Sequence, residues 1–176
     1  DTGRTVEDNC FVVDSPQQLL NCRVVTPAKG QTQLKVHGVY PLPGAFVVSG
    51  ILQNVSGVNY QANYVVRNNE IAPSLGRNLA ACGTRAVCTA TVTVPLIVPQ
   101  TQFEPRRTVL DLRMSKLFSV GPKARLRANL DVYNVLNNGS ILTINSNFGS
   151  SWRLPSGRSG GIMAARLVQF GGQLSF

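Results

Sequence analysis

The sequence has few charged residues, one histidine and no long apolar run, and each shortage excludes a class of protein. Charged residues make up 14% of the 176 residues and hydrophobic residues 43%, a balance too apolar for a disordered chain. No stretch approaches the roughly 18 consecutive apolar residues of a transmembrane helix. The chain begins neither with methionine nor with a basic and then apolar leader, so we expect a processed product or a fragment.

Residues for catalysis and metal binding are equally scarce. A catalytic triad needs a histidine, and the one histidine, His37, has no cysteine or acidic residue near it in the sequence. We expect it to be a polar group of a lumen or an interface. No P-loop, Gly-x-Ser-x-Gly or Gly-x-Gly-x-x-Gly pattern occurs. We therefore expect no enzymatic activity, no catalytic residue, no cofactor and no metal.

Basic residues outnumber acidic ones, 17 to 8, and give a net charge of +9. A nucleic-acid-binding domain gathers its lysines and arginines with aromatic residues on one face. Here the basic residues are spread over expected strand ends and loops, so we expect no nucleic-acid partner.

The four cysteines form two close pairs in polar, turn-rich stretches, Cys10 with Cys22 and Cys82 with Cys88. Zinc sites space their cysteines differently and add histidines. We expect two local disulfides, with free thiols as the alternative. Disulfides imply an oxidising compartment outside the cytosol.

Apolar positions recur at every second residue in five segments, which is the period of β-strands. The segments are 33–40, 46–55, 108–120, 124–136 and 162–176. Tight turns are expected at 41–45 and 121–123, and long, irregular links at 1–31, 56–106 and 137–161. The sequence therefore predicts an all-β fold, an antiparallel meander of about five long strands.

The alternation of short turns and long links indicates a membrane barrel. Structureless links of this length are uncommon in a compact soluble domain, whereas transmembrane β-barrels combine short periplasmic turns with long extracellular loops. The last three segments are also somewhat longer than the roughly 9–11 residues of a tilted membrane strand. Because bacterial single-chain barrels have even strand numbers, five strands predict a partial transmembrane β-barrel.

Strand alternation alone does not separate a barrel from a sandwich, since both have a period of two. The polar side of the third and fourth segments is densely charged, which suits a water-filled lumen. Its charged residues are Asp111, Arg113, Arg125, Arg127 and Asp131. If 121–123 is a three-residue turn, Arg113 faces Asp131, whereas a tighter register would set two aspartates opposite each other. We therefore predict an Arg113–Asp131 pair, in a lumen whose arginines favour anionic ligands.

The chain ends with an alternating segment whose last residue is aromatic. Gln169, Gly171, Leu174 and Phe176 follow the pattern polar-x-Gly-x-x-apolar-x-apolar. This ending resembles the β-signal by which outer-membrane barrels are recognised by their assembly machinery. A last strand offers its backbone edge to a partner strand. The alternative is an ordinary amphipathic last strand.

A second resemblance covers most of the chain. Residues 107–116 read RTVLDLRMSK and residues 124–137 read ARLRANLDVYNVLN. They resemble the DLR-x-SK and D-(V/I)-(Y/F)-N-(V/L)-(L/F)-N motifs in the C-terminal strands of TonB-dependent outer-membrane receptors. The likeness is closer to receptors with a carboxypeptidase-regulatory-like N-terminal domain, and it extends to residues 40–43 and 75–82.

The resemblance implies a 22-stranded barrel in the bacterial outer membrane, of which this chain supplies the last strands. The family's N-terminal plug and the rest of the barrel are not recognised in the chain, so we expect them as missing partners. Transport of a scarce ligand would be energised by TonB through that plug. Outer-membrane lipid or lipopolysaccharide and the barrel-assembly machinery are the other implied partners.

A different class of protein stays open as the alternative. It is a non-transporting surface or secreted β module, adhesin-like and braced by disulfides. In such a module the apolar side chains of the fourth segment would pack against a second sheet, whereas in a barrel they would face lipid.

Overall fold

The computed structural model describes residues 4–8, 14 and 20–176. Strands account for 48% and helices for 11% of the chain, so the predicted all-β class is confirmed. The chain divides into two compact units: the sheet unit, residues 32–57, 105–142 and 162–176, and the loop unit, residues 1–31, 58–104 and 143–161. Among the described residues, no helix is long and apolar enough to cross a membrane.

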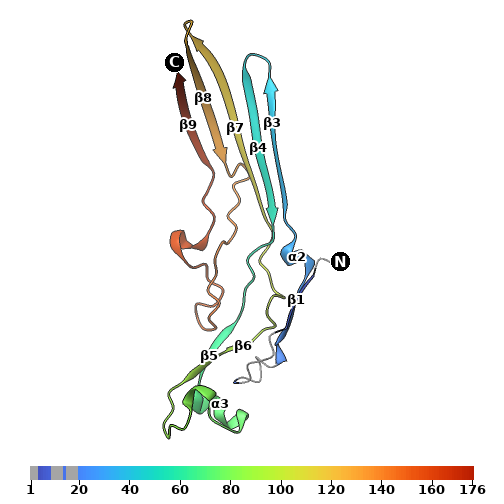
Figure 1. Cartoon of the computed structure of the whole chain (residues 1–176), viewed down its shortest axis with the longest axis vertical. Helices are drawn as coiled ribbons and strands as arrows, with labels where there is room; N and C mark the ends of the chain where they lie inside the picture. The colour runs from blue at the N-terminus through green and yellow to red at the C-terminus, as the bar shows by residue number, and fades with distance from the viewer. Residues whose placement is uncertain (1–3, 9–13, 15–19) are drawn as a thin grey trace. The chain divides into compact units, whose positions relative to one another are not determined.

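The sheet unit is built around one five-stranded antiparallel sheet (Figure 1). Its strand order is β3-β4-β7-β8-β9, so every strand pairs with the next strand of the unit along the chain. The strands are β3 (Leu34–Leu42), β4 (Phe46–Val55), β7 (Arg107–Val120), β8 (Ala124–Tyr133) and β9 (Leu167–Ser175). The predicted antiparallel meander of about five strands is therefore confirmed.

The two tight turns lie near their predicted positions. Between β7 and β8 the turn is 121–123, as predicted, with Gly121 at a φ of 76°. The turn between β3 and β4 is shorter than predicted, because β3 continues through Pro41, which pairs with Val47. Proline lacks the N–H of a central ladder but is tolerated in an outer strand, and β3 is the outermost strand of this sheet.

Two strands are shorter than predicted at the end away from the turns. Strand β8 ends at Tyr133 instead of 136, because Asn134 has a φ of 50°, a left-handed conformation that leaves the strand. Strand β9 begins at Leu167 instead of 162, because the preceding backbone bonds elsewhere. The Met163 N–H, for example, donates to the Ser140 carbonyl at 2.9 Å.

The long links contain short regular elements that the sequence pattern did not predict. In the loop unit these are β1 (Thr5–Asp8), β2 (Arg23–Thr26), α2 (Ala28–Gln31), β5 (Asn63–Arg67), α3 (Asn68–Leu75), the 3₁₀ helix η1 (Ala80–Cys82), β6 (Thr91–Pro95) and the 3₁₀ helix η2 (Arg158–Gly161). Strands β1 and β2 pair with each other, as do β5 and β6. Elements of three to eight residues are too short for a periodic pattern to stand out.

The loop unit has a small hydrophobic core of its own. Helix α3 and strands β5 and β6 enclose it, and a disulfide between Cys82 and Cys88 closes one side. Its buried residues are Val66, Ile71, Leu79, Cys82 and Val94. The segment 58–104 is thus a folded insertion between β4 and β7.

Candidate functional site

The five-stranded sheet has two chemically different faces. Every pairing in its register joins two even-numbered or two odd-numbered residues, such as Phe46 to Lys116 and Arg113 to Asp131. Because side chains alternate between faces along a strand, all even-numbered strand residues lie on one side, here called the apolar face. The odd-numbered strand residues form the polar face.

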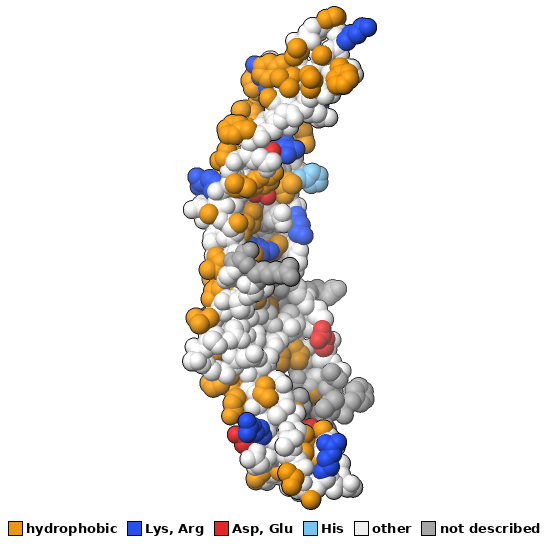
Figure 2. Space-filling model, turned by 90° about the vertical axis from the view of Figure 1, so that its left-hand side faces the viewer, with side chains coloured by type: hydrophobic (Ala, Val, Ile, Leu, Met, Phe, Trp, Pro, Cys, Tyr) orange, Lys and Arg blue, Asp and Glu red, His pale blue; other side chains and the backbone are white. Residues whose placement is uncertain are grey.

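The apolar face is uncovered over its whole width. None of its residues is buried, and Phe170 on β9 is 80% exposed. Leu126, Leu130 and Val132 of β8 are partly exposed. Figure 2 shows apolar side chains open on the surface of the part that this sheet forms. Soluble proteins rarely leave so large a contiguous apolar surface in water, so this face needs an apolar partner.

The polar face holds all five charged residues predicted for a lumen. Asp111 and Arg113 lie on β7, and Arg125, Arg127 and Asp131 on β8, all odd-numbered. Arg125 and Arg127 line a hollow of about 300 Å³ together with Gln173 and Ser175. His37 also lies on this face, in β3 opposite Ile51. The face can therefore offer cationic and hydrogen-bonding groups to a polar or anionic neighbour.

The predicted ion pair forms at the predicted register. Val120 pairs with Ala124 and Arg113 with Asp131. The guanidinium holds the carboxylate with two hydrogen bonds, Nε to Oδ1 and Nη2 to Oδ2, the latter at 3.0 Å. Asp131 is 5% exposed, and a bidentate geometry of this kind fixes orientation as well as charge. The pair therefore stabilises the alignment of β7 on β8 that their turn establishes.

A hydrogen-bonded network around an asparagine, which the sequence analysis did not predict, lies at the end of β7 and β8 away from their turn. The Asn134 side chain is buried, at 3% exposure. Its Nδ2 donates to the carbonyls of Asn138, at 2.9 Å, and Ala164, at 2.8 Å, while its Oδ1 accepts from the Asn138 N–H. The Asn134 N–H donates to the Asp111 carboxylate at 2.7 Å. Asn134 thus joins β7, β8 and the segment that leads to β9.

Asn138 extends this network by one step. Its Nδ2 donates to the Thr108 carbonyl at 2.9 Å, and its Oδ1 accepts from the N–H and the hydroxyl of Ser140. Asp111 and Asn134 stand within the motifs that carried the family resemblance. The position of these two polar residues within the motifs is therefore the sequence signal that could have pointed to the network.

The predicted assembly signal spans β9 and the residue after it. Gln169 and Gly171 lie on the polar face, opposite Asp131 and Asn129, whereas Leu174 lies on the apolar face, opposite Leu126. Phe176 is 99% exposed. In the described part of the chain, β9 pairs with β8 alone, so its other edge offers unpaired backbone groups.

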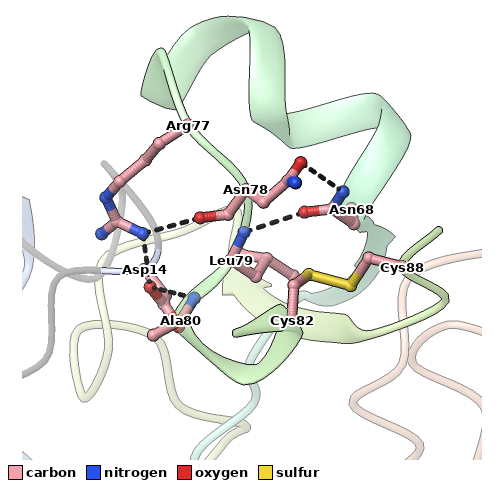
Figure 3. Close-up of polar contacts among 8 residues, drawn as sticks. All are labelled: Asp14, Asn68, Arg77, Asn78, Leu79, Ala80, Cys82 and Cys88. Carbon is pink, nitrogen blue, oxygen red and sulfur yellow. Dashed lines mark hydrogen bonds and ion pairs between the residues drawn. A yellow bond between two sulfur atoms is a disulfide. The ribbon is translucent and has the colours of Figure 1, made fainter. Parts of the chain in front are cut away.

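In the loop unit, polar contacts tie the insertion 58–104 to the N-terminal segment (Figure 3). Arg77 Nη1 donates to the Asp14 carboxylate at 3.1 Å, and the Ala80 N–H donates to the same group. Asn68 is buried, and its Oδ1 accepts from the Leu79 N–H at 2.8 Å. The helix α3 and the turn after it are thereby held over the disulfide.

The link 143–161 is bound to the insertion as well. Trp152 Nε1 donates to the Gln61 carbonyl at 2.8 Å. Arg153 lies over the Tyr60 ring, 4.3 Å from its centroid, and pairs with Glu104 at 3.1 Å. All three long links therefore meet in one loop unit, an arrangement that can recognise a ligand with residues from several segments.

The cysteine predictions are supported where the structure describes them. Cys82 and Cys88 form a disulfide with Cα atoms 5.4 Å apart, and Cys22 is disulfide-bonded. Cys10 lies outside the described residues. In the described ranges, no three His, Cys, Asp or Glu side chains gather closely enough to hold a metal ion.

No family model, curated protein or solved structure matches the chain. The functional interpretation therefore depends on the sheet's two faces and on the loop unit.

Proposed function

We propose that the chain is the C-terminal part of a TonB-dependent outer-membrane receptor, forming barrel wall and ligand-facing loops. One observation carries this proposal: a staggered five-stranded sheet with an uncovered apolar face and a charged opposite face. In a barrel the first face meets lipid and the second lines an aqueous lumen. Lipid would then cover the apolar face and water would solvate the charged face, so the sheet would need no second sheet to pack against it.

The strand lengths fit the thickness of a membrane. Strands β3 and β9 each have nine residues, which at about 3.3 Å per residue span about 30 Å. Tilted by roughly 40°, such a strand covers about 23 Å along the membrane normal, close to the roughly 25 Å apolar band of outer-membrane barrels. The longer β7 has 14 residues and would project beyond that band.

The stagger of the two hairpins supports the same reading. Phe46, the first residue of β4, pairs with Lys116, but the next turn begins only after Val120, four residues further along β7. Closing a sheet into a barrel requires the strands to tilt and the register to shift in this way. A flat sandwich sheet has no such need.

The lengths of the connections between strands indicate how the sheet would be oriented in the membrane. The two tight turns would lie on the periplasmic side and the long links outside the cell. The loop unit, with its disulfide, would then be the ligand-recognising part. The arginines of the polar face would line a lumen selective for anionic ligands, and energy would come from TonB through a plug supplied by another part of the protein.

The environment that each face of β8 meets provides a direct test of this proposal. Leu126 and Arg127 are neighbours on opposite faces, so Leu126→Cys and Arg127→Cys are matched variants. In outer membranes carrying the protein, we expect a lipid-dissolved quencher to reach a fluorophore at position 126 and a water-soluble quencher to reach one at 127. Equal access of the aqueous quencher to both positions would contradict the proposal.

The non-transporting module remains a second candidate, favoured by one observation. The insertion 58–104 has its own buried core and disulfide, as small secreted domains often do. An antibody against the last strand separates the two. A membrane band several times larger than 19.0 kDa supports the receptor, whereas a soluble band of that mass supports the module.

A further inference from the structure

We propose that Lys116, together with Phe46 and Phe118, binds the phosphate of an anionic glycerophospholipid on the apolar face. This inference rests on the proposed function, because it requires the apolar face to meet lipid. It adds a ligand class and three residues to that face, at the end of the sheet that carries the tight turns.

The register brings one ammonium group over two aromatic rings. Phe46 pairs directly with Lys116 across β4 and β7, and Phe118 follows two residues later on the same face of β7. Lys116 Nζ lies 4.3 Å from the centroid of the Phe46 ring and 5.1 Å from that of Phe118. Such cation–π contacts attract an ammonium group and hold it against an apolar surface.

Lys116 is the one charged side chain on the apolar face. The even-numbered strand residues of the sheet are otherwise apolar, apart from Tyr40 and from Asn54 and Thr108 at the far end. Within the described part of the chain, the ion pairs do not include Lys116. The Lys116 ammonium group has three hydrogens, and those that do not point at the two rings remain for an oxygen ligand.

At the other end of the apolar face, the polar groups are hydrogen-bonded to one another. There Asn54 Nδ2 donates to the Thr108 hydroxyl at 2.7 Å, and Arg106 Nε donates to Asn54 Oδ1 at 2.7 Å. Arg106 Nη2 also donates to the Thr32 carbonyl. These groups bond one another within the protein, whereas in the described part of the chain Lys116 lies against two aromatic rings.

A phospholipid phosphate fits this unmatched charge. A lysine beside hydrocarbon keeps its stem in the apolar layer and its ammonium at the headgroup level, where the phosphate oxygens of a neighbouring lipid lie. One lysine near an anionic surface contributes about 1 kcal/mol, or about fivefold in affinity. The two rings would position the ammonium group, so charge and aromatic contact both contribute to binding.

Native mass spectrometry of the whole chain in non-ionic detergent tests this site. With phosphatidylglycerol and phosphatidylcholine supplied together, we expect one phosphatidylglycerol to be retained with about fivefold preference. Lys116→Gln should abolish the preference. Lys123→Gln is the matched control, because it removes an exposed lysine of the adjacent turn and should leave the preference intact. The double variant Phe46→Leu/Phe118→Leu should weaken it while keeping the charge.

Three results would overturn the inference. They are no preference in the unaltered chain, equal losses in the Lys116 and Lys123 variants, and an unchanged preference without the two rings. A chain that stays monomeric without detergent and enters no micelle would instead contradict the proposed function.

Discussion

At the scale of single residues, Asn134 makes three side-chain hydrogen bonds at the end of β8. Its buried amide bonds the carbonyls of Asn138 and Ala164 and the N–H of Asn138. Its positive φ also suits asparagine better than most residues. Polar groups buried without partners destabilise a fold by about 1–3 kcal/mol each, so a single amide here stabilises the junction of three segments.

Asn134→Ala should therefore lower the free energy of unfolding by about 2–4 kcal/mol. Denaturant titration of the detergent-solubilised protein, followed by far-UV circular dichroism, measures this change. Asn129→Ala on the same strand is the control, with an expected change within about 0.5 kcal/mol. Equal midpoints for the two variants would show that the network does not hold β8.

Unlike Asn134, Phe176 should have no effect on stability. It is 99% exposed, so Phe176→Ala should leave the free energy of unfolding unchanged to within about 0.5 kcal/mol. If the last residue is read by the assembly machinery, the same variant should reduce the amount of protein in the outer membrane severalfold. Ser175→Ala is the control for both measurements. A normal membrane level for Phe176→Ala would refute the role as an assembly signal.

At the scale of elements, the strands of the sheet could be predicted from the sequence and the elements of the loop unit could not. The period of two is visible over ten residues or more in β7 and β8, and their turn fixes the register that pairs Arg113 with Asp131. By contrast, β5, α3 and β6 are short and are held by contacts between distant residues, such as Asn68 with Leu79. Such contacts leave no local pattern.

The disulfide of the loop unit yields a prediction about that element alone. Cys82 and Cys88 are six residues apart, and closing so short a loop stabilises by about 2 kcal/mol. Cys82→Ser with Cys88→Ser should therefore speed hydrogen exchange of the amides in α3 and β6 and leave β7 and β8 unchanged. Val87→Ser, at an exposed position between the two cysteines, is the control and should alter neither. Protection unchanged in α3 would contradict this role.

At the scale of the whole molecule, the proposed topology predicts that the insertion 58–104 lies outside the cell and that the turn 121–123 lies in the periplasm. Arg85 is an exposed residue of the insertion, and Lys123 is exposed in the turn between β7 and β8. On intact cells, trypsin should cut at Arg85 and spare Lys123 until the outer membrane is permeabilised. Because Arg85 lies between bonded cysteines, its two fragments should separate on gels only after reduction. Cleavage at Lys123 in intact cells would contradict the orientation.

The insertion 58–104 also bears on how the sheet is assembled. The Glu104 N–H donates to the Val58 carbonyl at 2.9 Å, and Asn59 bridges Phe103, so the folded insertion brings its two ends together. Strands β4 and β7 then pair across a connection that is effectively a few residues long. By loop-closure entropy this shortening saves roughly 2 kcal/mol. The strand pair that looks most distant along the chain is thus a local contact in folding, and its formation rate should follow the integrity of the insertion.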